Sequence, residues 1–387
     1  MQLPPPSLRL RVCVCVALGL TVALVRPVPA LVSGARIPDR IGDGEFWRLV
    51  SEFSEPGGDF RSDNLVSNEI VFARVVPALA RAAKSHGVYL GVGPEQNFTY
   101  IAAIRPRIAF ILDIRRGNLH LQLLYKALFE LSASRAEFVS RLFNREGLER
   151  LAPDVSARDL FAAALEAPIA TDAVYRSRLA DVREWLLTLH RLPLSAADLE
   201  GISSVYAALR RYGPTITWHS STNGTTGGRA EYAELMTQTD DTGAMLSYLA
   251  TEAQFQFVKE LETRNLVVPV VGDFAGVKAL KAIGQYLRDH DSLLTVFYVS
   301  NVESYLRQDD KWMSFCGNVA SIPHDETSVF VRPMAVGLQG DGMWPSTFAE
   351  ATADKWPGAR PLQAPLGRIA AEVDGCDVAD AAPGRMR

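Results

Sequence analysis

The sequence predicts an α/β protein whose core is a parallel sheet. Two apolar segments, Val88–Leu90 and Ile108–Leu112, have the length of buried strands and are separated by a segment of helical length. Strands that are buried on both faces read as continuous apolar runs, as these two do. The first strand runs into Gly91-Val92-Gly93, a loop without bulky side chains. Residues Gly87 to Asn118 are therefore predicted to form a nucleotide-binding β-α-β unit.

Length and composition are those of a globular protein with a full core. The chain has 387 residues, 48% of them apolar and 22% charged, and a net charge of −4. No long run of Lys or Arg is present, so nucleic acid is not expected as a partner. We expect the partner to be a small molecule. The sequence does not predict the oligomeric state.

The N-terminal segment predicts export. Arg9 and Arg11 precede the uncharged run Val12–Val25, and Val28-Pro29-Ala30 fits the small-residue rule for signal-peptide cleavage. Residues 1–30 are therefore read as a secretory signal, which would place the protein in the periplasm or outside the cell. Two alternatives stay open: an uncleaved anchor that alone touches a membrane, or a misassigned start and a cytoplasmic protein.

The elements follow in order from residue 31. Residues 31–63 are read as a lead-in along the surface, and 64–333 as the α/β domain. The first part of this domain holds the two strands and three predicted helices, at 64–84, 95–105 and 117–131. Residues 134–212 have only helical patterns and are predicted to be a helical insertion, followed by a polar loop at 213–230.

After the insertion the alternation of strands and helices resumes. Helices are predicted at 245–264 and 277–290, and strands at 266–271, 293–299 and 329–332. Residues 334–387 are read as a C-terminal extension that is partly disordered, with fraying expected over 371–387. Cys316 and Cys376 could pair if the chain is exported, and two free thiols fit equally well. The sequence contains no Cys/His cluster of the kind that binds a metal ion.

The ends of four predicted strands carry the candidate site residues. Ligands of open parallel sheets bind outside the carboxyl ends of the strands. Glycine lets a ligand approach the backbone, and a following helix N-terminus offers unpaired N–H groups. An acid about 20 residues further on can accept both ribose hydroxyls. In order, these strand-end residues are Gly91 and Gly93, Asp113, Asp273, and Ser300 with Asn301.

With these motifs the chain resembles the class I S-adenosylmethionine-dependent methyltransferases, a Rossmann-like fold. The resemblance lies in Tyr89–Gly93, Ile111–Ile114, Val271–Phe274 and Phe297–Asn301 and covers roughly residues 64–131 and 245–332. It implies S-adenosylmethionine as the cofactor and a role for each strand end. Gly91 and Gly93 would contact its methionine part, Asp113 its ribose and Asp273 its adenine. Ser300 and Asn301 would face the transferred methyl group.

Two positions depart from the methyltransferase pattern. Tyr89 replaces an acid, and Glu95 replaces a third glycine. Glu95 is kept as a cofactor-binding candidate, although a buried carboxylate there would repel the cofactor's own carboxylate. It could instead cap its helix or bind a cationic group of the ligand.

Four further residues are candidates for substrate binding: Asn68, Arg115, Arg116 and His219. The two arginines could clamp a phosphate or carboxylate, or one could pair with Asp113. His219 could act as a general base, or lie in a solvated loop.

The sequence thus predicts methyl transfer from S-adenosylmethionine to an unknown small molecule. The alternative is an exported Rossmann-like protein, non-catalytic or with another chemistry, that binds a nucleotide-like or other polar ligand. A scaffold that recruits a protein through its helical insertion is a third hypothesis. Segments 62–69 and 113–118 also resemble those of a bacterial family without an assigned function.

Overall fold

A computed structural model describes residues 1–2, 36–60, 62–69, 72–220, 230–332 and 366–376. The chain divides into two units, Met1–Ser33 and Gly34–Arg387, and the account below concerns the second. The predicted signal or anchor at 1–30 falls almost wholly outside the described residues. Within those ranges, no helix combines the length and apolar character needed to cross a membrane.

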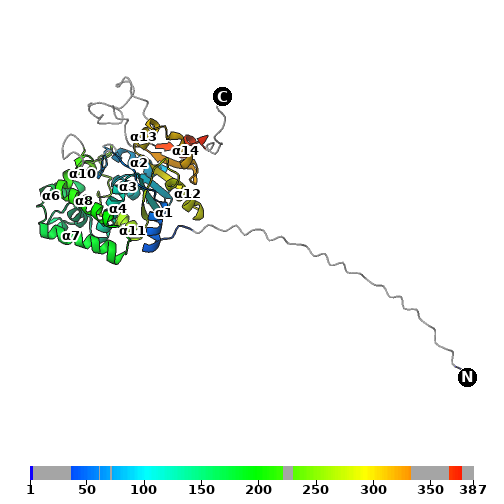
Figure 1. Ribbon diagram of the computed structural model, residues 1–387, viewed down its shortest axis with the longest axis horizontal. Helices are drawn as coiled ribbons and strands as arrows, with labels where there is room; N and C mark the ends of the chain where they lie inside the picture. Colours follow the sequence, from blue (N-terminus) through cyan, green and yellow to red (C-terminus); the bar gives the residue numbers. More distant parts are fainter. Residues whose placement is uncertain (3–35, 61, 70–71, 221–229, 333–365, 377–387) are drawn as a thin grey trace, which may run out of the picture. The chain divides into compact units, whose positions relative to one another are not determined.

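A single six-stranded sheet forms the centre of the second unit (Figure 1). Its strands lie in the order β3-β2-β1-β4-β5-β6. Their bounds are β1 Val88–Val92, β2 Ile108–Asp113, β3 Val267–Val271, β4 Leu294–Tyr298, β5 His324–Val331 and β6 Leu366–Arg368. All neighbours are parallel except β6, which is antiparallel to β5. The predicted α/β class with a parallel sheet is confirmed, and this strand order is consistent with a Rossmann-like fold.

Strands β1, β2, β3 and β4 are buried at every position, which explains their continuous apolar sequences. The chain winds from β1 outward to β2 and β3, and then crosses to β4 on the other side of β1. The winding direction therefore reverses between β1 and β4. In open parallel sheets such a reversal leaves room for a ligand at the carboxyl edge.

Helices cover the sheet in two contacting groups. One group consists of α1 (Asp43–Phe53), α12 (Ala279–Asp289) and α14 (Trp312–Ala320). The other consists of α2 (Phe72–Ala82), α3 (Gln96–Ile104), α4 (Arg116–Leu131) and α11 (Glu252–Thr263). Helix α13 (Val302–Gln308) follows β4 and leads to α14. Together these helices position the carboxyl ends of β1, β2 and β4.

The prediction that residues 31–63 run along the surface is wrong for their central part. Helix α1 packs on β3 and buries Phe46, Leu49, Val50 and Phe53. Phe53 stacks on Phe110 of β2 with 6.1 Å between ring centroids. The spacing 46, 49, 50, 53 is that of one helix face, so the signal was present in a segment of only three turns.

Two predicted helices are shorter than expected at their N-terminal ends. The helix predicted at 64–84 begins only at Phe72, because residues 62–69 are irregular and Asn64 has a φ of +44°. The helix predicted at 245–264 begins at Glu252, where the Thr251 side chain caps it by accepting from the Gln254 N–H.

A helical region lies between α4 and α11, and thus between β2 and β3; this is the helical insertion. Its α-helices are α5 (Arg135–Phe143), α6 (Ala157–Glu166), α7 (Asp172–Glu184), α8 (Ala196–Tyr212) and α10 (Tyr232–Met236), with a π-helical turn at Trp185–Leu189. Helix α8 packs against α4, which joins the insertion to the sheet domain. Of the predicted polar loop, residues 221–229 lie outside the described residues.

The C-terminal extension contributes to the fold. Its described part, 366–376, forms β6 and helix α15 (Ile369–Glu372), so the prediction that 371–387 are frayed is wrong for 371–376. A disulfide joins Cys316 of α14 to Cys376. Of the two alternatives left open by the sequence, the structure therefore has the paired one.

Candidate functional site

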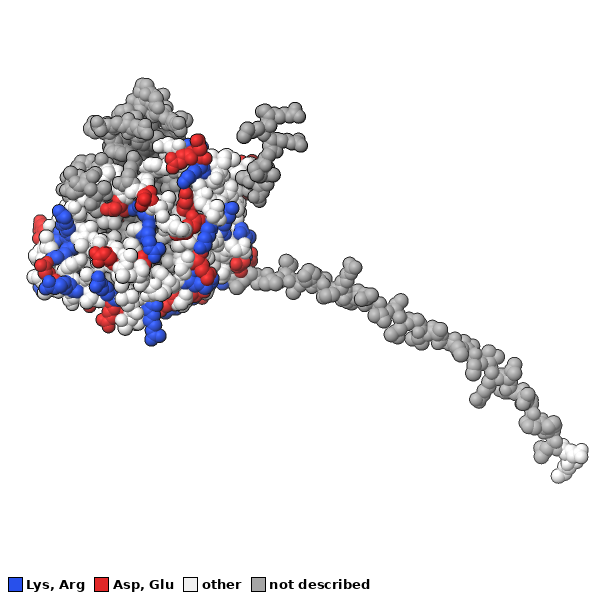
Figure 2. Space-filling model, viewed as in Figure 1, with Lys and Arg blue, Asp and Glu red and all other residues white. Residues whose placement is uncertain are grey.

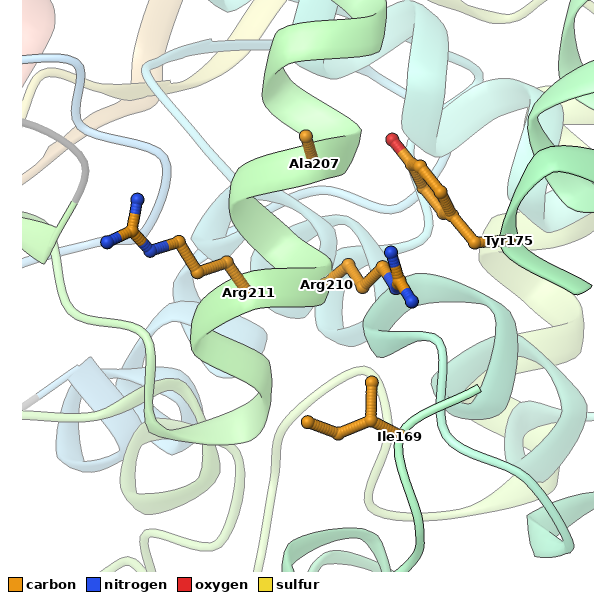
Figure 3. A pocket seen from close by; sticks show the side chains of 5 residues that line it. All are labelled: Ile169, Tyr175, Ala207, Arg210 and Arg211. Carbon is orange, nitrogen blue, oxygen red and sulfur yellow. The ribbon is translucent and has the colours of Figure 1, made fainter. Parts of the chain in front are cut away.

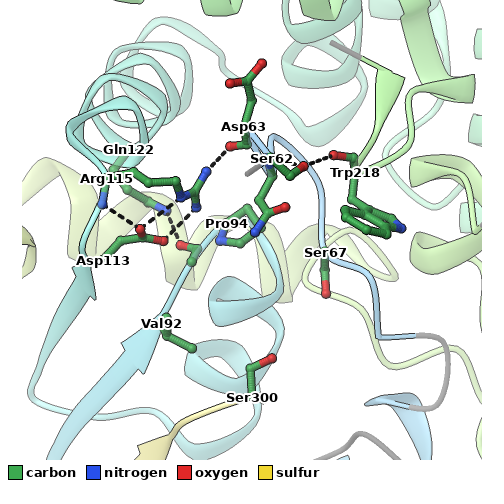
Figure 4. A network of polar contacts seen from close by, with 12 residues as sticks. Ser62, Asp63, Ser67, Val92, Pro94, Asp113, Arg115, Gln122, Trp218 and Ser300 are labelled. Carbon is green, nitrogen blue, oxygen red and sulfur yellow. Dashed lines mark hydrogen bonds and ion pairs between the residues drawn. The ribbon is translucent and has the colours of Figure 1, made fainter. Parts of the chain in front are cut away.

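Four chain segments meet at the carboxyl edge of the sheet: the ends of β1, β2 and β4 and the irregular segment 62–69 (Figure 4). Three residues at this edge have positive φ angles, Asn64 (+44°), Gly93 (+79°) and Ser300 (+50°), as do several residues elsewhere in the described chain. Non-glycine residues in this conformation are strained and cluster at functional sites. This edge of the sheet is therefore the candidate ligand site.

The two glycines of the β1 loop have different roles. A Cβ at Gly91 would lie 1.9 Å from Asn97 Oδ1 and 2.6 Å from Tyr89 Oη, so the space beside Gly91 is already filled by the protein. At Gly93 the nearest atom to a Cβ is Asp113 Oδ2 at 3.9 Å. Position 93 therefore requires glycine because its backbone is left-handed, and the space between Gly93 and Asp113 is open.

Asn97 fixes the shape of this loop. Its Nδ2 donates to the carbonyls of Val92, Gly93 and Pro94 at 3.0, 3.2 and 2.7 Å. The Tyr89 hydroxyl donates to Asn97 Oδ1 at 2.8 Å, and both side chains are fully buried. Tyr89, where methyltransferases have an acid, thus supports the loop from inside the domain.

Asp113 is engaged by its own neighbour. Arg115 Nε and Nη2 donate to Asp113 Oδ1 and Oδ2 at 3.0 and 2.7 Å, and the Arg115 N–H donates to Oδ1 at 2.9 Å. Arg115 Nη1 donates to the carbonyl of Asp63 (Figure 4). This pair is almost completely buried and ties segment 62–69 to the end of β2. Of the two roles considered for Arg115, the structure shows the pairing with Asp113.

Three buried acceptor atoms near this edge have no partner among the described residues: Asn64 Oδ1, Asn118 Oδ1 and Gln122 Oε1. Gln122 donates through Nε2 to the Gly93 carbonyl at 3.0 Å, which places its free oxygen beside the loop. Asn118 precedes it by one turn on the same face of α4. Unpaired buried acceptors are costly, so a ligand with hydrogen-bond donors would be stabilised here.

Glu95 lies beneath segment 62–69. Its carboxylate accepts the Ser67 N–H at 3.1 and 3.2 Å, and the side chain is fully buried. Burial raises the pKa of Glu95 to about 8, although hydrogen bonds from the backbone N–H groups of Ser67 and Glu95 itself oppose this rise. Its protonated form is favoured at neutral pH, which removes the charge repulsion expected from the sequence.

Glu69 is one of the polar residues upstream of the glycine loop that, from the sequence, could line a pocket or serve only as caps and surface groups. It is buried and accepts hydrogen bonds from Ser300 Oγ and, at 2.9 Å, from Gln96 Nε2. Burial raises the pKa of Glu69 to about 7, against hydrogen bonds from Ser300, Gln96 and Tyr298. The sequence signal was weak, because Glu69 is one of several polar residues upstream of the glycine loop.

The remaining candidates lie in three places. Arg116 is paired with Asp198 of α8 at 2.7 and 3.0 Å, so it joins the insertion to α4 and does not reach the strand ends. Asp273 lies at the end of β3, is partly exposed and forms an ion pair with Lys311 at 2.9 Å. Asn301 and Asn68 are partly exposed, next to Ser300 and Glu69 respectively.

His219 is partly exposed, and its ring lies 3.4 Å from that of Trp218, centroid to centroid. The Trp218 carbonyl accepts from Ser62 Oγ at 2.9 Å, so the segment that carries His219 contacts the start of segment 62–69.

A shallow hollow on the insertion is lined by Ile169, Tyr175, Ala207, Arg210 and Arg211, with the Arg210 guanidinium 4.6 Å above the Tyr175 ring (Figure 3). On the face shown in Figure 2, acidic and basic side chains are intermingled, with no broad patch of one sign. No group of three or more His, Cys, Asp or Glu among the described residues could hold a metal ion.

Fold and site together define an α/β protein, consistent with a Rossmann-like fold, with a candidate ligand site at the carboxyl edge of its sheet. The chain belongs to the family Domain of unknown function (DUF7790), whose sequence profile matches residues 65–164 and 201–353. The match includes the glycine loop, the ends of β2 and β4, and α8 from residue 201 onward, but omits α7 and the π-helical turn. A search of curated proteins found no match to the chain.

Proposed function

We propose that the protein is an S-adenosylmethionine-dependent methyltransferase that acts on a small molecule and holds its cofactor at the ends of β1, β2 and β4. The observation that carries this proposal is the open side of Gly93, next to Asp113 and the unpaired Gln122 Oε1. The reversal of strand order at β1 and β4 supports the same position.

The residues present fit the chemistry of this cofactor. The edge offers acceptor groups: the Asp113 carboxylate, the amide oxygens of Gln122 and Asn118, and Glu69. S-adenosylmethionine presents two ribose hydroxyls, an ammonium group and a sulfonium, all of which seek acceptors or negative charge. When bound, it supplies a methyl group that is already activated for transfer, so the protein contributes alignment.

Asp113 would hold the ribose hydroxyls in place of its contacts to Arg115. The released guanidinium would then be free to pair with an anionic group of the cofactor or substrate, as bidentate arginine contacts do. Glu95 in its neutral form would not oppose the carboxylate of the cofactor. Ser300 and Asn301, at the end of β4, would face the reacting methyl group.

Calorimetric titration with S-adenosylmethionine tests the proposal. Asp113→Asn keeps the shape of the side chain but removes its charge, and we expect at least a tenfold loss of affinity relative to wild type. Asp198→Asn is the matched control: it also breaks a bidentate pair with an arginine, but in the insertion. Absence of binding by the wild type, or equal binding by Asp113→Asn, would contradict the proposal.

A second candidate function is favoured by the disulfide between Cys316 and Cys376. Structural disulfides persist in oxidising compartments, whereas S-adenosylmethionine is made and kept in the cytoplasm. The alternative is an exported protein that binds another donor-rich polar ligand at the same edge. Cell fractionation and the mass of the mature N-terminus separate the two: a cleaved, exported chain that does not bind S-adenosylmethionine would favour the alternative.

A further inference from the structure

Glu69 is a buried carboxyl group without a cationic partner. It is 1% exposed, and among the described residues no Lys, Arg or His forms a hydrogen bond or ion pair with it. Buried carboxylates are ordinarily paired with a cation, as Glu303 is with Arg332 in this protein. Glu69 therefore lacks the positive charge that would stabilise its ionised form.

The groups that surround Glu69 are neutral. Gln96, Tyr298 and Ser300 donate hydrogen bonds to it, and the phenols of Tyr89, Tyr100 and Tyr298 interact with its charge. Burial raises the pKa of each of these phenols well above its usual value, so they stay protonated near pH 7. Glu95, linked through Ser67 and Gln96, has a pKa of about 8.

Ser300 connects Glu69 to the ligand edge. It is partly exposed at the end of β4, has a left-handed backbone and donates through Oγ to Glu69. While its hydroxyl hydrogen points to Glu69, the lone pairs of Oγ remain available on the other side. Independently, Gln122 Oε1, in a side chain that is 3% exposed, has no partner beside the same loop. Both features call for a ligand that is positively charged or rich in donors.

We propose that Glu69, through Ser300, is the counter-charge for a sulfonium or ammonium group of the ligand, and that Glu69 loses its proton when this group binds. The inference rests on the proposed function, since S-adenosylmethionine supplies the sulfonium. Beyond the proposed function, Glu69 and Ser300 would select ligands by their charge at the end of β4.

The number of protons released follows from ordinary linkage. A nearby positive charge stabilises the carboxylate and lowers its pKa. With a pKa of about 7 before binding, Glu69 is about half protonated at pH 7, so the cation displaces up to about half a proton per ligand. The neutral thioether S-adenosylhomocysteine carries the same ammonium and carboxylate groups but no sulfonium. The difference between the two ligands isolates the sulfonium charge.

The experiment is calorimetric titration at pH 7 in buffers of different ionisation enthalpy, which counts the protons released. For the wild type, we expect S-adenosylmethionine to release about half a proton more than S-adenosylhomocysteine. Glu69→Gln keeps the shape of the side chain and one acceptor oxygen but cannot ionise, so it should abolish this difference, and Ser300→Ala should reduce it. Glu262→Gln is the matched control, because Glu262 is also fully buried with a pKa of about 8 but lies on α11; the difference should persist.

The outcomes separate the two proposals. Binding of both ligands with equal proton release would overturn the role of Glu69 and leave the proposed function standing. If the difference in proton release between the two ligands persists in Glu69→Gln, the role of Glu69 is also overturned, provided that circular dichroism and melting show a folded variant. Binding of neither ligand by the folded wild type would overturn the proposed function, and this inference with it.

Discussion

Replacing each glycine of the β1 loop with alanine should have different consequences for stability. In Gly91→Ala the new Cβ would lie 1.9 Å from Asn97 Oδ1, so the Asn97 side chain must move. It would then lose its hydrogen bonds to the carbonyls of Val92, Gly93 and Pro94. Three bonds at about 1 kcal/mol each, with about 1–3 kcal/mol for overpacking, give a destabilisation of about 4–6 kcal/mol.

Gly93→Ala meets no clash, because its nearest neighbour would be Asp113 Oδ2 at 3.9 Å. The cost is that of placing an alanine at a φ of +79°, about 1–2 kcal/mol. The fold should therefore persist. The added methyl group would point toward Asp113, into the space proposed for the ligand, and should weaken S-adenosylmethionine binding.

Urea unfolding followed by circular dichroism measures both free energies of unfolding. Gly44→Ala is the control, since a Cβ there has no atom within 4 Å and lies in helix α1, where alanine is favoured. We expect the order of stability Gly44→Ala, wild type, Gly93→Ala, Gly91→Ala, from highest to lowest. Equal losses for the two loop variants, or a greater loss for Gly93→Ala, would refute the assignment of their roles.

Two further predictions concern the stability of the whole domain. The Cys316–Cys376 disulfide closes a loop of 60 residues, so Cys316→Ser with Cys376→Ser should lower the free energy of unfolding by up to about 4 kcal/mol, and added reductant should affect only the wild type. Glu95 binds its proton more tightly when folded, so its contribution to stability is present below pH 4.5 and lost as pH rises to about 8. Glu95→Gln should reduce the fall in stability between pH 5 and pH 9 by on the order of 4 kcal/mol; an unchanged pH profile would count against this account of Glu95.

The parts of the fold that sequence reasoning predicted are those set by local pattern. Val88–Leu90 and Ile108–Leu112 are continuous apolar runs because parallel strands are buried on both faces. This property is sufficient to identify the two strands from the sequence. Strand β6 has only three residues, and its place in the sheet depends on antiparallel pairing with β5. Such pairing depends on the fold of residues far apart in sequence, which the local pattern does not contain.

The candidate site was predictable in position and less so in chemistry. Asp113 and Gly93 lie at the expected edge because strand ends follow from the strands. Whether Arg115 faces Asp113 or a ligand depends on the Asp63 carbonyl, 52 residues away in sequence, which accepts from its third nitrogen. The contact of Glu69 with Ser300, 231 residues further along the chain, exists only in the folded protein, so its part in the site did not follow from the sequence.

The electrostatics of this edge bear on which ligands it can accept. Of the described groups gathered here, Arg115 carries the positive charge, and Asp113 already neutralises it. An anionic ligand must therefore break that buried pair, and the carboxylate left behind would oppose its binding. A cationic, donor-rich ligand has two advantages: Glu69 can ionise in response to it, and Gln122 and Asn118 can accept its hydrogen bonds. The balance at this edge thus favours a ligand with a positive group near Ser300, whether the protein transfers a methyl group or only binds.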